Sequence, residues 1–495
     1  MTSGHDCDVL IIGGGPTGVT LGILLAQQGV RTIIAEREPG IYPLPRAAHI
    51  DHEGMRILQQ AGVADAVMAT CRHTTRYDFL NAKGEILLRF DGSDRIGSGG
   101  WPAANFIHQP SVEHALRARL AELPDAELRS DWRLEAFEEE SDGVTAHLVT
   151  SDGPRIIRSR YLVGADGARS PVREAAGIGF DDLDFDEPWL VIDAIVHDYD
   201  RLPKVNLQIC DPIRPTTCVL MGEGRHRWEF MIKPGETTEQ VLDEDFIAAL
   251  LAPWDVQGAV TLERKAVYRF NARIATRWRQ GRILIAGDAA HQMPPFAGQG
   301  LCSGLRDAAN LGWKLPLVVN GKADPALLDT YQPEREPNVR GVIAMAMMMG
   351  KTVCITDPDA AAARDEQMLA ARAAGMVLDG PPAYPPIMTG CILAGAPGAG
   401  SYFPQLAASD GTRFDDFAGH GPWLVSDATV ASATGLVLVS ASDSDMSSFA
   451  AGLRAELQRH ECAAILVRPD RSIFGAGTVE VLSTAWHAAL QPPTS

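Results

Sequence analysis

Three glycines and one carboxylate near the N-terminus have the spacing of a dinucleotide-binding site. Gly13, Gly15 and Gly18 separate a short apolar run from an apolar helical pattern, and Glu36 closes the next β-branched run. In such a unit the glycines permit a tight turn, the approach of a pyrophosphate to backbone N–H groups, and close packing of helix on strand. The carboxylate can hold a ribose hydroxyl. A glycine-rich loop can be a simple turn, but strand, helix and acid together predict nucleotide binding over 8–36, without separating NAD from FAD.

Two later stretches place an aspartate directly after an apolar strand. Asp166 lies in GADGARS, for which an ordinary strand, turn and helix is the alternative interpretation. Asp288 lies in GDAAHQMPP, where Pro295 belongs to a rigid crossover. Gly298 and Gly300 follow, and small residues there would let a flat ring approach the backbone at a helix N-terminus.

Two polar side chains between these stretches could also meet a cofactor. Arg46 follows a proline-rich loop, where it could contact a phosphate or form a surface salt bridge. Gln109 stands just before a predicted helix and can both donate and accept hydrogen bonds.

The elements that must position these residues follow an α/β pattern with α+β inserts. Strand, turn and helix are predicted at 8–36, 161–174 and 281–315. Alternating β-rich runs between 189 and 270 predict an antiparallel sheet, interrupted by one helix near 241–252.

The composition indicates a globular protein, and the length predicts about three domains. The chain has 495 residues, 46% of them hydrophobic, and a formal charge of −19, which disfavours nucleic acid and anionic membranes as partners. No apolar stretch is long enough to span a membrane and no signal peptide is visible, so a cytoplasmic location is expected. The eight cysteines contain no CxxC, so neither a disulfide framework nor a metal site is predicted.

Taken together, the chain resembles the class A flavoprotein aromatic hydroxylases, the family of para-hydroxybenzoate and phenol hydroxylases, and most resembles the 3-(3-hydroxyphenyl)propionate hydroxylase branch. The resemblance covers roughly 6–353 and is carried by GGGPTG with Glu36, GADGARS and GDAAHQMPP, in this order. It implies a Rossmann-like FAD-binding domain, an antiparallel-sheet substrate domain and a C-terminal thioredoxin-like domain.

These domains divide the chain as follows. The FAD-binding domain comprises 1–180, with a segment at about 75–105 shared with the substrate sheet, and 276–380; the substrate domain is 181–275, the linker 381–400, and the thioredoxin-like domain without CxxC 401–495.

The resemblance also implies which residues hold the cofactor. It places Glu36 and Arg37 on the adenosine side, Arg46 and Gln109 against FAD, Asp166 in a role for both FAD and the pyridine nucleotide, Asp288 on the ribityl chain, and the backbone of Gly300, Leu301 and Cys302 at the flavin ring, with Pro295 and Gly298 in the same segment. Many members have Asn where Cys302 stands, a change that backbone contacts can survive.

The activity implied is that of an FAD-dependent NAD(P)H:O₂ monooxygenase. Such enzymes hydroxylate a small phenolic aromatic substrate through a C4a-hydroperoxyflavin and need no metal. The chain has no second nucleotide fingerprint, as expected where the reductant binds transiently, and NADH versus NADPH stays open. A homodimer is a candidate assembly.

The residue that activates the phenol is not evident from the motifs. Phenol hydroxylase uses an aspartate where this chain has Ala48. Tyr268 on a strand of the predicted sheet could supply a hydroxyl, and His52 is a second catalytic candidate; the alternative is that both only pack or cap.

Two other functions fit parts of the same pattern. A monooxygenase that tailors a polyketide or inactivates an aromatic antibiotic would use the same cofactor residues with a wider pocket. A non-enzymatic binding protein could retain the fold, although the complete set of cofactor motifs argues against it. A flavin-dependent halogenase is disfavoured because its WxWxIP signature is missing.

Overall fold

The first layer of the protein is a mostly parallel sheet. The structure, a computed structural model, describes residues 4–376 and 384–491. The sheet has the order β16-β17-β10-β1-β2-β7, with β9 paired to β10 and β8 to β9. Its apolar strands are covered on their faces, as parallel strands require. The strands are β1 Cys7–Ile12, β2 Thr32–Ala35, β7 Ala126–Arg129, β8 Arg133–Glu139, β9 Val144–Thr150, β10 Gly153–Gly164, β16 Arg279–Gln280 and β17 Ile283–Ile285.

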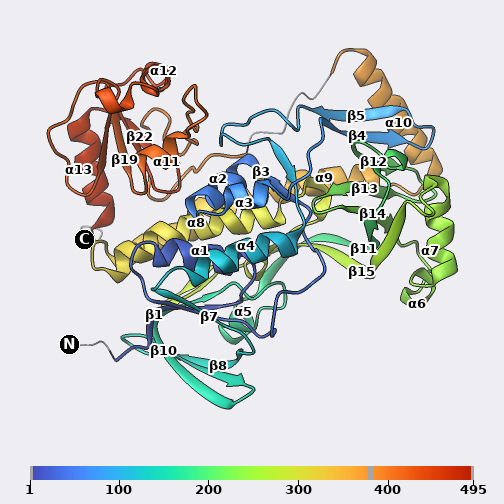
Figure 1. The fold of residues 1–495 in the computed structure, drawn as a ribbon, viewed down its shortest axis with the longest axis horizontal. Helices are drawn as coiled ribbons and strands as arrows, with labels where there is room; N and C mark the ends of the chain where they lie inside the picture. The colour runs from blue at the N-terminus through green and yellow to red at the C-terminus, as the bar shows by residue number, and fades with distance from the viewer. Residues whose placement is uncertain (1–3, 377–383, 492–495) are drawn as a thin grey trace.

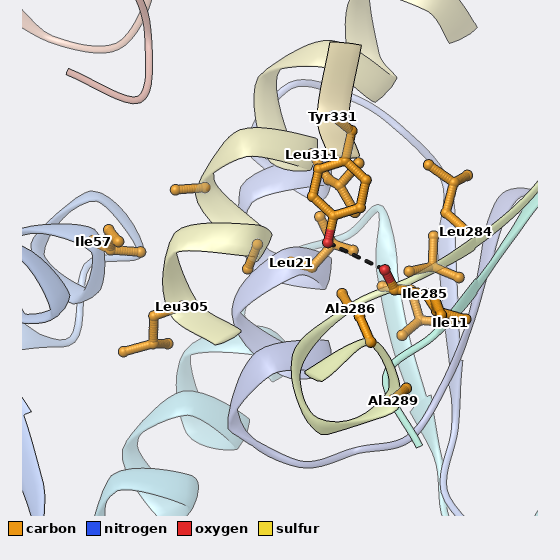
Figure 2. Packing of buried hydrophobic residues seen from close by; sticks show 14 of the residues in the cluster. Ile11, Leu21, Ile57, Leu284, Ile285, Ala286, Ala289, Leu305, Leu311 and Tyr331 are labelled. Atoms are coloured by element: carbon orange, nitrogen blue, oxygen red, sulfur yellow. Dashed lines mark hydrogen bonds between the residues drawn. The ribbon is translucent and has the colours of Figure 1, made fainter. Parts of the chain in front are cut away.

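Three helices pack together on this sheet. They are α1 Pro16–Ala26, α4 Gln109–Ala121 and α8 Gly300–Val319. Helix α1 is apolar on all sides and almost wholly buried, because it lies between the sheet, α4 and α8. Figure 2 shows this core, in which Tyr331 donates a hydrogen bond of 3.1 Å to the carbonyl of Ile285. That bond ties α9 (Tyr331–Val353) to the end of β17.

A second sheet of eight strands lies beside the first unit (Figure 1). Its order is β18-β15-β11-β14-β13-β12-β4-β5, and helices α6 (Thr238–Val241) and α7 (Glu244–Leu251) cover its outer face. The sequence predicts an antiparallel sheet, and the pairs within 180–275 are antiparallel, but β12 and β4 pair in parallel. The strands are β4 Arg76–Asn81, β5 Ile86–Asp91, β11 Phe180–Val196, β12 Asn206–Cys210, β13 Thr216–Met221, β14 Arg225–Met231, β15 Val260–Ala275 and β18 His291–Gln292.

Strands β4 and β12 can pair in parallel because they are far apart in the sequence. Strand β4 comes from an earlier segment, about 130 positions before β12, so no hairpin fixes its direction. The two longest strands also exceed the predicted ones, since β11 has 17 residues and β15 has 16.

The C-terminal unit is a small mixed sheet with helices. Its order is β20-β19-β21-β22, with β19 and β20 parallel and the other pairs antiparallel. Figure 1 shows it beside α2 and α8, on the side away from the second sheet. The thioredoxin-like assignment stays a prediction, as do the domain boundaries; positions 381–383 of the predicted linker lie outside the described residues. The elements are β19 Trp423–Ser426, β20 Val437–Ser440, β21 Ala464–Val467, β22 Ile473–Gly477, α11 Phe414–Ala418, α12 Ala450–Arg459 and α13 Val479–Leu490.

Short elements complete the described chain. The two-stranded sheet of β3 (His49–Asp51) and β6 (Ala104–Phe106) leads into α2. Within 4–376 and 384–491, no single helix has the length and apolar character to cross a membrane, although one bent pair, Pro325–Val353 with Pro358–Ala373, meets that test by length and composition. The remaining elements are α2 His52–Gln60, α3 Ala64–Met68, α5 Pro171–Ala175, α10 Pro358–Ala373, η1 Tyr199–Arg201, η2 Ala252–Trp254, η3 Gly287–Ala289, η4 Pro295–Ala297, η5 Pro325–Thr330 and η6 Ser444–Met446.

Candidate active site

The three predicted motifs lie at one edge of the parallel sheet. Their loops follow the carboxyl ends of β1, β10 and β17, which are neighbouring parallel strands. Ligands of open α/β sheets bind at this edge. Gly13 has φ of 111°, and a Cβ there would lie 2.3 Å from the carbonyl oxygen of Ala165. Glycine at this position therefore brings the first two motifs into backbone contact.

The other glycines of the first motif have different surroundings. A Cβ on Gly18 would lie 2.1 Å from the carbonyl oxygen of Gly13, whereas a Cβ on Gly15 would meet no atom within 4 Å. Gly18 is thus required by packing inside the protein. Gly15 instead leaves the amides at the N-terminus of α1 open to an incoming anion.

Glu36 is held beside this loop. Its Oε2 accepts a hydrogen bond of 2.6 Å from the Gly14 amide, and its Oε1 accepts one of 2.9 Å from the Glu38 amide. Arg37 is exposed and pairs with Glu38 at 3.3 Å. Arg117 on α4 donates to the Gly14 carbonyl at 3.0 Å, a contact that no motif in the sequence predicts.

The two motif aspartates have unfilled acceptor positions. Asp166 accepts a hydrogen bond of 3.0 Å from the Val172 amide through Oδ2, while its Oδ1 is buried without a partner among the described residues. Burial raises the pKa of Asp166. Asp288 is exposed between the buried residues Gly287 and Ala289, and no described residue donates a hydrogen bond to its carboxylate. Carboxylates with free acceptors fit the hydroxyls of a ribityl or ribose group, so these residues fit FAD.

The segment at 295–302 is pinned to β3. Pro295 begins η4, and Gly298 ends it in the left-handed conformation with φ of 62°. The Gly298 carbonyl oxygen lies 3.0 Å from Nδ1 of His49, and the Sγ of Cys302 accepts from the Asp51 amide at 3.4 Å.

This pinned segment leaves one stretch of backbone accessible. A Cβ on Gly300 would meet only Cγ of Met293, at 3.8 Å. Leu301 is half-buried and Cys302 is buried, and burial raises the pKa of the Cys302 thiol. The first turn of α8 therefore offers backbone amides rather than a reactive side chain to a ring lying against it.

Arg46 and Gln109 meet at one carboxylate. The guanidinium of Arg46 is half-exposed and lies 3.7 Å from Glu113. Gln109 accepts from the Ala47 amide at 2.7 Å and donates to the Glu113 carboxylate at 2.7 Å. Gln109 therefore holds the loop that presents Arg46, and direct contact of either side chain with FAD stays a prediction.

The same loop is fixed to the second sheet by a buried ion pair. Arg227 donates to both carboxylate oxygens of Asp193, at 2.6 and 3.1 Å, and to the carbonyls of Pro45 and Arg46, both at 2.8 Å. Arg264 also donates to the Pro45 carbonyl. Sequence reasoning missed this cluster, because its partners lie up to 182 positions apart and share no local motif.

The two catalytic candidates occupy different surroundings. Tyr268 is half-buried on β15, on the same face as Arg264, whose guanidinium lies 4.9 Å from the tyrosine ring. Its hydroxyl therefore belongs to the side of the sheet that carries the Pro45 loop. His52 begins α2, and its Nδ1 accepts from the Gly99 amide at 3.1 Å. The imidazole is buried beneath the loop that contains Gly99. The catalytic roles of Tyr268 and His52 stay predictions.

An aromatic cluster lies where the second sheet meets the 295–302 segment. The ring of Phe296 lies 5.6 Å from Trp189, 6.1 Å from Phe270 and 6.0 Å from Phe185. Such a cluster can exclude water from the junction between cofactor and substrate.

Comparison with known proteins identifies the family. A model of the FAD binding domain family matches residues 6–346. A probable NADH-specific resorcinol 4-hydroxylase of Rhodococcus jostii (strain RHA1) is 38% identical over 493 residues, which is 94% of this chain and 91% of that protein. The chain belongs to the FAD-dependent aromatic hydroxylases. Its cofactor is therefore FAD, as the family resemblance implies.

Other relatives match less of the chain or differ more in sequence. The 3-(3-hydroxy-phenyl)propionate/3-hydroxycinnamic acid hydroxylase of Mycobacterium sp. (strain JLS) is 41% identical over 374 residues, which is 73% of this chain and 63% of that protein. The solved structure of aklavinone-11 hydroxylase with FAD and aklavinone has a TM-score of 0.81 at 26% identity, over 99% of this chain and 100% of that chain. These matches confirm the predicted resemblance and fold class for this aromatic hydroxylase.

Proposed function

We propose that this FAD-dependent aromatic hydroxylase uses NADH and O₂ to hydroxylate a small phenol of the resorcinol type. One observation carries the proposal: groups that fit FAD meet at one edge of the parallel sheet. They are the open amides at Gly15, the unfilled carboxylates of Asp166 and Asp288, and the accessible backbone at Gly300. The likeness to the Rhodococcus resorcinol hydroxylase extends over nearly the whole of both chains, which favours that substrate class and NADH as the reductant.

The chain contributes binding, orientation and exclusion of water. Bound FAD supplies hydride acceptance from the reductant and activation of O₂. The glycine loop and Glu36 hold the adenosine end, Asp288 the ribityl chain, and the first turn of α8 the ring. The Trp189–Phe296 contact limits water at the ring, and Tyr268 presents a hydroxyl on the facing sheet. A phenol placed between sheet and ring would have its hydroxylated carbon oriented by that sheet.

A second candidate is tailoring of a larger polycyclic aromatic substrate. Its support is the TM-score of 0.81 to aklavinone-11 hydroxylase over the full length of both chains. The two candidates share cofactor residues and differ only in substrate size, so a panel of substrates separates them.

The proposed activity is tested on the purified flavoprotein. NADH and NADPH oxidation would be followed in air with resorcinol, 3-(3-hydroxyphenyl)propionate and a polycyclic phenol, and both hydroxylated product and H₂O₂ would be measured. Resorcinol should accelerate NADH oxidation and yield more product than peroxide. Acceleration only by the polycyclic phenol would favour the tailoring function. A yellow protein whose NADH oxidation no phenol accelerates would contradict both and support a binding role.

Location and assembly are part of the same proposal. We infer a cytoplasmic enzyme, because all eight cysteines are free thiols, which is typical of a reducing compartment. The net charge of −19 supports a small-molecule partner over nucleic acid or an anionic membrane. A homodimer stays a prediction that size-exclusion chromatography with light scattering would test.

A further inference from the structure

Glu229 is a buried carboxylate on the inner face of the second sheet. Its neighbours along β14, Trp228 and Phe230, belong to the outer core under α7, so alternation along the strand turns Glu229 the other way. Across the sheet it pairs with Val191 on β11 and Thr217 on β13. Glu229 thus faces the FAD-binding unit from the middle of the sheet.

The two segments expected to contact the cofactor lie on either side of this position. Two residues before Glu229 on the same face, Arg227 holds the carbonyls of Pro45 and Arg46. Two residues after it, Met231 pairs with Trp189, whose ring contacts Phe296 just before the 298–302 turn. Glu229 therefore faces the space between the Arg46 loop and the first turn of α8.

The carboxylate of Glu229 has no hydrogen-bond donor among the described residues. Glu229 is 6% exposed. The nearest cation is Nη1 of Arg227, at 3.8 Å, and that guanidinium is already bound to Asp193 and to two carbonyls. Burying a carboxylate without a hydrogen-bond donor costs folding free energy, so we expect a ligand to supply the donor to Glu229.

Polar groups of neighbouring strands surround the same space. On β4 the Tyr77 hydroxyl donates to Gln208 at 2.8 Å, and Gln208 in turn is hydrogen-bonded to Thr217 at 2.8 Å. Within the described part of the chain, Arg227, Asp193 and Tyr77 are the titratable groups that interact electrostatically with Glu229. Burial raises the pKa of Glu229 to about 7, with Asp193 adding to the rise and Arg227 opposing it. The group can therefore take and release a proton near neutral pH.

We propose that Glu229 is the base that accepts the phenolic proton of the substrate, an inference that rests on the proposed hydroxylase function. The O–H bond of the phenol breaks, the proton forms an O–H bond with the Glu229 carboxylate, and the electron pair stays on the phenolic oxygen. The phenolate ring is more nucleophilic and reacts more readily with an electrophilic oxygen. When the product leaves, the neutral carboxyl returns the proton to water.

Three variants test this role with resorcinol as the probe. Glu229→Gln keeps the shape and removes the base, and Glu229→Asp keeps a carboxylate on a shorter stem. Glu244→Gln on α7 removes a carboxylate that is 93% exposed in the same unit and serves as the control. Product, H₂O₂ and NADH oxidation would be measured from acid to alkaline pH on flavin-loaded protein, together with FAD content and thermal stability.

In the parent enzyme kcat/KM for resorcinol, measured by product formation, should rise with pH through about 7 and then level off, because only the ionised carboxylate accepts a proton. Glu229→Gln should lack this step and form product roughly 10²–10⁴-fold more slowly at neutral pH. Its rate should recover only toward the ionisation of the phenol itself, near pH ~10. Glu229→Asp should keep the step at a lower rate, and Glu244→Gln should match the parent.

Three results would overturn the inference, and they differ in what they leave standing. If Glu229→Gln retains the parent's product rate and pH profile while Glu244→Gln does too, the hydroxylase function stands and Glu229 only balances Arg227. If the parent forms no product from resorcinol, the proposed small-phenol function fails, and the role of Glu229 fails with it. Should Glu229→Gln not fold, a Glu229→Asp variant that keeps the parent's rate would equally contradict the proposal.

Discussion

Two glycines in one loop illustrate how the same residue type is required for opposite reasons. At Gly18 the neighbouring atom is backbone within the protein, so the requirement is internal and belongs to stability. At Gly15 the space beyond the Cα is open, and the backbone conformation (φ −78°, ψ 179°) suits any residue. No described atom of the protein requires glycine at position 15, so we expect the requirement to come from a ligand that approaches the amide.

This difference predicts separate effects for two alanine variants. Gly15→Ala should change the free energy of unfolding of the apo-protein by less than about 1 kcal/mol, but weaken FAD binding at least ~10-fold, because a methyl group would stand between the amides and the pyrophosphate. Gly18→Ala should destabilise the fold by roughly 1–3 kcal/mol or more. Denaturant unfolding and quenching of FAD fluorescence measure the two quantities. Unchanged FAD affinity in Gly15→Ala would show that the pyrophosphate does not approach there.

At the scale of elements, the sequence predicts what is local and misses what is distant. The strand–turn–helix units around Gly13, Asp166 and Asp288 were predictable because glycine spacing and apolar periodicity lie within about thirty residues of one another. The contact of Arg227 with Pro45 was not, because it joins a sheet strand to a loop 182 positions away. Glu229 was missed for a related reason: in sequence it is one acid among many, and only the pleat of β14 shows which face it takes.

The Asp307 network joins several elements behind the Asp288 loop. Oδ2 of Asp307, on α8, accepts from the Gly287 amide at 2.9 Å and from His291 at 2.7 Å, and Oδ1 accepts from Arg335 on α9 at 2.9 Å. Asp307 is fully buried. It therefore fixes the turn that carries Asp288, the residue that we propose holds the ribityl chain.

Replacing this buried anion should affect both folding and cofactor binding. Asp307→Asn leaves Arg335 without its charge partner and should lower the free energy of unfolding by about 3–5 kcal/mol, with weaker FAD binding. Asp329→Asn breaks a pair that Arg279 makes with a carboxylate 71% exposed, and should cost only about 0–1 kcal/mol. Denaturant unfolding compares the two, and equal losses would contradict a special role for Asp307.

The same residue predicts the sign of a pH effect. Burial alone would raise the pKa of Asp307, but His291 and Arg335 outweigh burial, so the folded-state pKa lies below its ordinary value. The stabilisation is therefore present above the unfolded-state pKa, about 4, and is lost as pH falls from there through the folded-state pKa. In Asp307→Asn this part of the acid destabilisation should be absent, which unfolding curves at several acidic pH values would measure.

At the scale of the whole molecule, buried ion pairs join the C-terminal unit to the FAD-binding unit. Arg468 donates to Glu334 on α9 at 2.7 Å, and Glu334 also binds Lys314 on α8 at 2.8 Å. A second pair joins Arg56 on α2 to Asp415 on α11 at 2.6 Å. Such pairs demand one relative orientation of the two units, because a misplaced unit would leave buried charges unpaired.

The Arg468 pair predicts that the C-terminal unit helps to stabilise helices α8 and α9 of the FAD-binding unit. Arg468→Met removes a fully buried cation that also donates to the Cys391 carbonyl at 3.0 Å, and leaves Glu334 with Lys314 as its remaining cation. The free energy of unfolding should fall by about 3–5 kcal/mol. Arg459→Met, at a side chain 67% exposed, should be nearly neutral and is the control.

Flavin release on heating gives a second measurement. Glu334 on α9 and Lys314 on α8 lie on helices packed against the proposed cofactor edge, so flavin release should accompany unfolding, and not precede it, in both variants. Flavin release that precedes the loss of helix only in Arg468→Met would show instead that the pair acts on the cofactor site locally, and an unchanged unfolding midpoint would show that the two units are held together by their apolar contacts alone.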